Sequence, residues 1–182
     1  MIISYTISGP DNDSYMFDSD TYLGDCSCCN ARLKQKVNEN FILGKNTYDI
    51  SYTYDDYLIV SQGFKDFCIK TKQNNLNFHT LKSQPNFYFM EATSILEFDS
   101  LKRETEFINK CDCCGVYEEL IGATPAFLKE SKEIIKEGIY RTDIEFGSKK
   151  NRGPLIIMGV ETLNVFREQR FKGLEYRAIN ND

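Results

Sequence analysis

Hydrophobic and polar positions along the chain alternate in a way that predicts two strand-helix-strand units. The first unit opens with a buried strand over residues 56–61 and closes with a half-buried strand over residues 76–81. Ser61, at the end of the first strand, is a suitable N-cap for a helix. Four side chains then follow at the i, i+3, i+4 and i+7 spacing of one helix face: Phe64, Phe67, Cys68 and Thr71.

The second unit lies near the end of the chain and has the same order of elements. A strand over residues 153–159 precedes a helix, and a strand over residues 174–179 closes the unit. The apolar positions of that helix stand three apart, at Val160, Leu163 and Phe166. We interpret the match between the units as an internal duplication within a single domain, with related halves at about residues 1–84 and 85–182.

Other segments predict additional strands and one more helix. Thr124 and Pro125 resemble an N-cap followed by proline at the first helical position, which predicts a helix that ends at Gly138. The narrow apolar face of this helix would carry Phe127, Ser131, Ile134 and Ile135. Strands are expected over residues 2–8, 87–90, 94–98, 104–108 and 139–146. Together these elements predict a β-rich α+β fold with two strand-helix-strand repeats.

Six of the seven cysteines lie in two similar segments, residues 26–29 and residues 111–114, and we call each segment a knuckle. Each knuckle contains a C-x-x-C pattern. About 80 residues separate the knuckles, which is too many for one compact finger, so the fold must bring them together. Asn30 and Gly115 follow the two knuckles, and both residue types tolerate the positive φ that such a turn often needs.

Four thiolates that meet in this way suit a structural Zn²⁺ site, which would join the two halves. The ligands that we predict are Cys26, Cys29, Cys111 and Cys114. Cys28 or Cys113 is an alternative ligand, through a C-x-C choice in either knuckle. A thioredoxin-like redox site is a poorer match, because it uses a single C-x-x-C at the start of a helix. A catalytic zinc site would use three protein ligands and leave one position open.

The composition restricts the class of partner. The 182 residues carry 22 basic and 27 acidic side chains, for a formal charge of −5, and phosphate recognition needs a local excess of Lys and Arg. No apolar run approaches the ~20 residues of a membrane span, and the start of the chain lacks the pattern of a signal peptide. We therefore expect a cytoplasmic protein without nucleic-acid or membrane partners. In reducing cytosol its cysteines would be metal ligands or free thiols rather than disulfides.

Other residues give weaker indications of chemistry. His79 is the single histidine, and the sequence shows no partner that would make it a general base. The acidic segment 11–20 lacks the spacing of an EF-hand. The basic segment 147–153 is expected to be a solvated loop, and the charged positions of residues 141–145 an ordinary strand surface. We find no phosphate loop or nucleophile elbow, so we do not expect an enzyme.

The chain resembles the double-CXXCG-motif proteins that act as immunity factors in bacterial polymorphic toxin systems, including the swarming-inhibition type. The resemblance covers nearly the whole chain from about Gly24 onward. It rests on the two knuckles and on three further segments: residues 58–68, residues 138–147, and the ending from residue 154 to residue 176. The chain departs from the family pattern in lacking glycine after Cys29 and in having a third cysteine in each knuckle.

This resemblance implies a non-catalytic protein that binds and neutralises a cognate protein toxin. An acidic, tyrosine-rich face would occlude the active site of the toxin or block its folding, with complementary charge speeding association. The candidate contact residues are Tyr52, Tyr54, Asp55 and Asp56, with the segment 11–20 and Tyr48 beside them. The competing function is a zinc-ribbon-like nucleic-acid-binding or regulatory adaptor.

Overall fold

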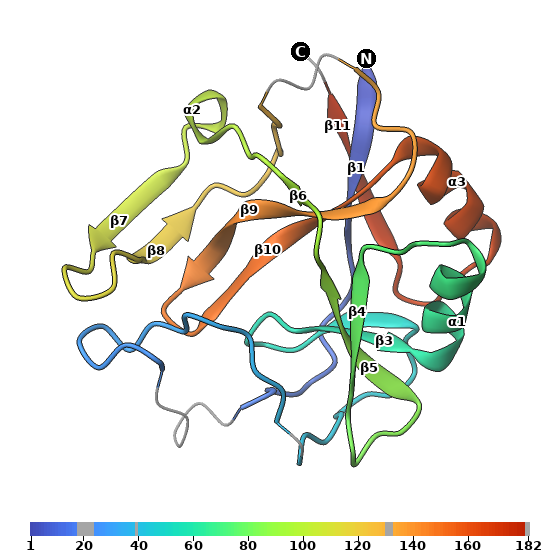
Figure 1. Ribbon diagram of the computed structural model, residues 1–182, viewed down its shortest axis with the longest axis horizontal. Helices are drawn as coiled ribbons and strands as arrows, with labels where there is room; N and C mark the ends of the chain where they lie inside the picture. Colours follow the sequence, from blue (N-terminus) through green and yellow to red (C-terminus); the bar gives the residue numbers. More distant parts are fainter. Residues whose placement is uncertain (18–23, 39, 130–132, 181–182) are drawn as a thin grey trace.

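The computed structural model describes residues 1–17, 24–38, 40–129 and 133–180, which form two β-sheets and three helices (Figure 1). The larger sheet contains β1 (Ile2–Ser8), β6 (Ile95–Leu96), β7 (Glu106–Lys110), β8 (Tyr117–Ile121), β9 (Ile139–Ser148), β10 (Asn151–Met158) and β11 (Glu175–Asn180). The smaller sheet contains β2 (Ile50–Tyr52), β3 (Leu58–Ser61), β4 (Leu76–Thr80) and β5 (Phe87–Ala92). The helices are α1 (Gln62–Lys70), α2 (Ser100–Arg103) and α3 (Val160–Glu168). The fold is therefore β-rich α+β.

The two sheets repeat one strand order. The smaller sheet runs β2-β3-β5-β4, and the larger sheet contains the run β9-β10-β1-β11, with β8 and then β7 continuing the sheet on the other side of β9. Within these runs all neighbours are antiparallel, whereas β6 pairs with β9 in parallel. Each predicted strand-helix-strand unit is thus present, as β3-α1-β4 and as β10-α3-β11.

In each unit the two strands are separated by a strand from the other half of the chain. β5 lies between β3 and β4, and β1 lies between β10 and β11. Each half therefore contributes its first strand to the sheet of the other half. Because of this exchange, neither half can complete its sheet alone, and the two halves are interlocked.

The helices form as their sequence pattern predicts and meet in one core. The Ser61 hydroxyl accepts a hydrogen bond from the Phe64 backbone N–H at 3.2 Å, which caps the start of α1. Phe64 of α1 and Phe166 of α3 are both fully buried, and their ring centroids lie 5.4 Å apart in an edge-to-face arrangement. In Figure 1, α1 and α3 lie side by side on the same flank of the molecule. The core between the sheets is therefore shared by both halves.

The outer face of each sheet is covered by irregular segments. Alternation along the strands sends Ile157 of β10 to a second apolar cluster that includes Phe98 and Leu120. It sends Ile59 of β3 to a third cluster that includes Met16 and Phe41. Three apolar clusters therefore hold the fold together, one between the sheets and one on the outer face of each sheet.

The helix predicted from Thr124 to Gly138 is wrong for the described part of that segment; Ser131 lies outside the described residues. Its backbone groups pair with other segments instead of with one another. The Asp99 N–H donates to the Phe127 carbonyl at 2.8 Å, and the Lys129 N–H donates to the Glu97 carbonyl at 2.9 Å. From this extended segment Ala126 is buried and Leu128 packs against the same apolar cluster, whereas Ile134 is 43% exposed. The strand expected over 94–98 is reduced to β6, and α2 follows it.

The prediction of a solvated loop over residues 147–153 is also wrong. Most of the segment belongs to a hairpin in which Ser148 of β9 pairs with Asn151 of β10. Lys149 and Lys150 form its turn. The antiparallel pairing of two long strands extends through these residues, and this places the hairpin turn beside the segments that follow both knuckles.

Candidate metal centre

The two knuckles have the same local structure. The Asn30 N–H donates to the Cys26 carbonyl, and the Gly115 N–H donates to the Cys111 carbonyl, each at 2.8 Å. Asn30 and Gly115 both have positive φ, 59° and 72°, as predicted. Each turn is closed by a further backbone bond, from Cys26 to Ala31 and from Cys111 to Val116. The repeat in sequence is therefore also a repeat in backbone geometry.

The fold brings the two knuckles together, and four of their sulfurs form one cluster. The Sγ atoms of Cys26, Cys29, Cys111 and Cys114 all lie within 4.8 Å of one another. Across the cluster, Cys26 Sγ is 3.9 Å from Cys111 Sγ, and Cys29 Sγ is 3.7 Å from Cys114 Sγ. Both cross-contacts join residues 85 positions apart. Four sulfurs at this spacing make a possible metal site formed by both halves.

The thiols of the cluster differ in their electrostatic surroundings. The backbone N–H groups of Cys29 and Cys28 point at the Cys26 sulfur and lower the pKa of that thiol to about 6. Burial raises the pKa of Cys29 to about 12, and the neighbouring sulfurs of Cys111, Cys26 and Cys114 add to this rise. Without a cation, therefore, the four thiols do not all ionise near neutral pH. A bound metal ion would supply the missing positive charge.

The remaining cysteines of the knuckles, Cys28 and Cys113, form a disulfide with each other. The expectation of thiols without disulfides is thus wrong for this pair. The disulfide forms because the fold brings equivalent residues of the two knuckles together. Cys28 and Cys113 are 85 positions apart, as are the two pairs of cluster sulfurs that lie across from each other. Both residues are exposed. The structure places both of these alternative C-x-C ligands outside the four-sulfur cluster.

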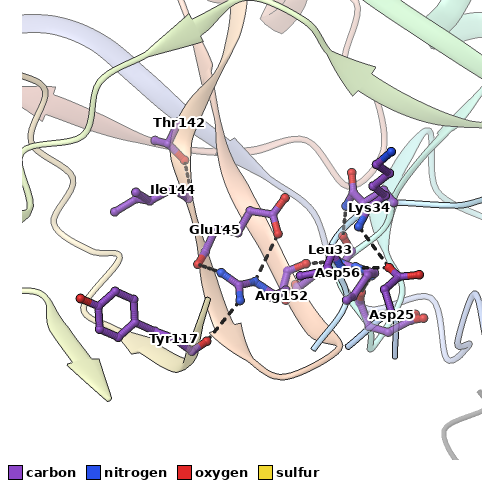
Figure 2. Close-up of polar contacts among 12 residues, drawn as sticks. Asp25, Leu33, Lys34, Asp56, Tyr117, Thr142, Ile144, Glu145 and Arg152 are labelled. Atoms are coloured by element: carbon purple, nitrogen blue, oxygen red, sulfur yellow. Dashed lines mark hydrogen bonds and ion pairs between the residues drawn. The ribbon is translucent and has the colours of Figure 1, made fainter. Parts of the chain in front are cut away.

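Two buried arginines connect the segments that follow the knuckles. Arg32, 3% exposed, donates to the carbonyl of Asp55 at 2.9 Å and to the carbonyl of Arg152. Arg152, in turn, donates to the carbonyl of Tyr117 at 3.3 Å and forms an ion pair with Glu145. Figure 2 shows the Arg152 guanidinium between Glu145 and the Tyr117 backbone. A continuous chain of contacts therefore runs from the segment after the first knuckle to the segment after the second.

Backbone contacts of the β9–β10 turn reinforce this connection. The Arg32 N–H donates to the Lys149 carbonyl at 3.4 Å, and the Lys149 N–H donates to the Glu118 carbonyl at 2.8 Å. Asp25, just before the first knuckle, accepts hydrogen bonds from the Leu33 and Lys34 N–H groups (Figure 2). Sequence reasoning did not identify these supports, because contacts to backbone carbonyls leave no residue pattern. The position of Arg32 three residues after Cys29 was the one available signal.

The predicted partner-binding residues do not share one exposed face. Tyr54 is 44% exposed, and its ring contacts Tyr15 with centroids 5.1 Å apart. Asp55 is only 5% exposed, because its carboxylate accepts hydrogen bonds from the Met16 and Phe17 N–H groups. Asp55 therefore holds the preceding loop in place and does not belong to a contact surface. Asp18 and Asp20 of the acidic segment lie outside the described residues.

Tyr52 and Asp56 are partly buried and line a cavity of about 380 Å³ where the two sheets meet. We call this cavity the junction crevice; its walls include Ile7, Asp11, Phe146 and Pro154. Burial raises the pKa of Asp56 to about 6, an effect that the nearby charge of Arg32 partly opposes. The crevice thus combines mostly apolar walls with two carboxylates, Asp11 and Asp56, and Asp56 is costly to ionise.

The other candidate residues have structural surroundings. His79 Nε2 lies 3.2 Å from Glu91 Oε2, and the imidazole stacks on Phe89. Asp143 accepts a hydrogen bond from the Phe98 N–H at 2.8 Å, so it fixes the segment after β6. Cys68 is fully buried in α1, and burial raises the pKa of its thiol to about 12. These residues therefore have packing or backbone partners.

Comparison of the chain with protein-family models, with curated proteins and with solved structures finds no match. None of the helices in the described part of the chain has the length and apolar character needed to cross a membrane.

Proposed function

We propose that this protein is a cytoplasmic immunity protein, which binds a cognate bacterial toxin and neutralises it by direct contact. It performs no catalysis, and a structural zinc ion stabilises it. The proposal joins two sources of support: the family resemblance of the sequence motifs and the arrangement of the junction crevice beside a clamped pair of knuckles. A metal ion that joins the two knuckles would keep the halves in a fixed relative position. The junction crevice, which opens between the two sheets, would then keep its shape for a partner.

Zinc suits the four-cysteine cluster better than other common metals. Tetrahedral Zn²⁺ with Zn–S bonds of ~2.3 Å places its sulfurs ~3.8 Å apart, and the two cross-cluster separations are 3.7 and 3.9 Å. Four sulfur ligands leave no open position, so the ion would be structural rather than catalytic. The ligands come from both halves, and the ion would hold the knuckles together at the end of the molecule where no strand pairs them.

The observation that carries the binding proposal is the partly buried carboxylate of Asp56 in the junction crevice. No described residue donates a hydrogen bond to the Asp56 carboxylate, although apolar walls surround it. A basic side chain of a partner would neutralise this carboxylate in a site of low dielectric, where an ion pair is stronger than in water. The formal charge of −5 would speed association with a basic partner. Tyr54 and Tyr15, on the adjoining surface, are suitable aromatic anchors.

Co-expression tests this function. The gene immediately upstream is expressed in a bacterial host alone and together with this chain, and colony survival is counted. We expect the neighbouring gene to kill alone and the host to survive when the chain is present. A harmless neighbour, or killing that the chain does not prevent, would contradict the proposal. A gel shift with duplex DNA and with RNA at moderate salt tests the adaptor function, and we expect no shift.

A matched set of variants links protection to the crevice. Asp56→Asn removes the charge and keeps the shape; because asparagine also tolerates the positive φ of 61° at this position, the turn is preserved. Tyr176→Ala, on the exposed face of β11, is the control. We expect Asp56→Asn and Tyr54→Ala to weaken protection and Tyr176→Ala to leave it unchanged. Equal protection by all variants would contradict the claim that the junction crevice binds the toxin.

A further inference from the structure

Cys28 and Cys113 differ from the other knuckle cysteines in position and in exposure. Neither belongs to the four-sulfur cluster, and both are exposed to solvent. Each directly precedes a residue of the cluster, Cys29 or Cys114. They are bonded to each other across the boundary between the halves. A small molecule can therefore reach this pair, whereas Cys26 is buried and Cys68 is enclosed in the core.

We propose that Cys28 and Cys113 are a reversible dithiol–disulfide site, which locks the two halves together, and that a metal ion in the cluster directs oxidation to this pair. The second part rests on the metal site proposed above. The co-reactant is a small-molecule disulfide. The disulfide, which we call the clasp, thus adds a covalent link between the halves next to the proposed metal site.

The reaction is a two-step thiol–disulfide exchange. The thiolate of one cysteine attacks the small disulfide, forms a mixed disulfide and releases one small thiolate. The second protein thiolate then attacks the protein sulfur of the mixed disulfide, forms the Cys28–Cys113 bond and releases the second small thiolate. The two protons leave the protein thiols and pass through water to the released thiolates. The two protein sulfurs lose two electrons in total, the small disulfide is reduced by two, and excess small thiol reverses the reaction.

The geometry explains why a metal would select this product. In the metal-free protein, six thiols from two knuckles lie in one region, and six thiols permit 15 complete pairings. When Cys26, Cys29, Cys111 and Cys114 coordinate a metal, their electron pairs are engaged and only two knuckle thiols remain. Those two are already held face to face, because equivalent residues meet across the cluster. Metal loading therefore converts a mixture of disulfides into one product.

The clasp has a measurable effect on stability. The bond links residues 85 positions apart, and a cross-link over a loop of that length restricts the unfolded chain. We expect oxidation to raise the Tm of the zinc-loaded protein by roughly 5–15 °C. Zinc content should not change, since none of the four cluster thiols takes part.

The experiment uses the full chain, fully reduced and loaded with zinc, exposed to oxidised glutathione and then to excess reduced glutathione. Free thiols are alkylated after unfolding and each cysteine is assigned by peptide mass spectrometry, with Cys68 as the internal reference for a thiol that stays reduced. We expect a single Cys28–Cys113 cross-link, retention of one zinc per chain, and full reversal. Protein stripped of zinc should give mixed disulfides. The double variant Cys28→Ser/Cys113→Ser should bind zinc normally and show neither the cross-link nor the Tm shift.

Three outcomes would overturn the inference. Stable glutathione adducts on Cys28 and Cys113, in place of the cross-link, would show that the two thiols do not meet. Loss of zinc on oxidation would show that the cluster thiols are attacked. The same single cross-link with and without zinc would contradict direction by the metal. A chain that binds no zinc at all would instead refute the metal site and, with it, direction of the oxidation by a metal. If that chain still formed a specific and reversible Cys28–Cys113 bond, the reversible disulfide alone would be supported.

Discussion

The Sγ atoms of Cys29 and Cys114 lie 3.7 Å apart, although 85 residues separate them in the chain. The contact exists because each half contributes one knuckle of the same backbone geometry, and because the β9–β10 turn supports both. The two halves are joined in two places. One is the pair of interlocked sheets, and the other is the cysteine cluster. A single ion at this point would therefore connect parts of the chain that form no strand pair with each other.

The ligand assignment predicts opposite results for two neighbouring cysteines. Cys114→Ser removes a member of the cluster, whereas Cys113→Ser removes a thiol that lies outside it. We expect Cys114→Ser to reduce zinc affinity by more than the ~10–100-fold typical of changes around the ligands. Cys113→Ser should keep one zinc per chain. Competition with a chromogenic chelator measures both affinities, and the reverse order would favour the C-x-C ligand choice.

The buried Arg32 should contribute to stability through its hydrogen bonds to the carbonyls of Asp55 and Arg152. Arg32→Met removes the donors to the carbonyls of Asp55 and Arg152 and leaves those acceptors without these partners. We expect a loss of about 1–3 kcal/mol in the free energy of unfolding, measured by urea denaturation. Arg177→Met, at an exposed position of β11, is the matched control and should change stability by less than ~0.5 kcal/mol. Equal effects of the two variants would contradict a bracing role for Arg32.

Asp56 predicts a dependence of stability on pH. Its pKa is about 6 in the folded protein and 3.8 in the reference state, so ionisation disfavours the fold above pH 6, and this cost disappears as the pH falls toward 4. Asp56→Asn should therefore increase the free energy of unfolding at pH 7 by up to about 3 kcal/mol. The gain should shrink toward zero at pH 4. Urea denaturation of both proteins at each pH measures the difference; a gain that is the same at both values would contradict the burial of this charge.

The contact between Phe64 and Phe166 should be one of the main stabilising contacts between the halves. Phe166→Ala opens a cavity where α1 and α3 meet, and we expect a loss of about 3–5 kcal/mol in the free energy of unfolding. Val165→Ala changes the adjacent residue of α3, which is 43% exposed, and should cost less than ~1 kcal/mol. A small effect of Phe166→Ala would show that the two helices are not held by this core.

The sequence predicts the regular parts of this fold well. Periodic apolar positions identify α1, α3 and the strands around them, and the side chain of Ser61 caps α1 as expected. These predictions succeed because the hydrophobic face of each element coincides with its local propensity. The residues of the cysteine cluster could also be selected from spacing, since the duplicated C-x-x-C leaves few sets of four sulfurs.

Other features depend on contacts that have no local signature. The exchange of β1 and β5 between the halves is a matter of strand pairing over long sequence distances. The segment after Pro125 has helix-start residues, yet its backbone bonds go to residues 97–99. Asp55 looks like a surface charge in the sequence, but two backbone N–H groups of a distant loop bind it. In each case a tertiary hydrogen bond overrides the local pattern.

The metal content of the purified full chain tests the central claim most directly. The protein is prepared under reducing conditions without added metal, its zinc is measured by elemental mass spectrometry, and its thiols are titrated before and after unfolding with a chelator. We predict one zinc per chain, with four thiols that become reactive only when the zinc is released. A chain without zinc whose seven cysteines all react freely would contradict the claim that one metal ion joins the two halves.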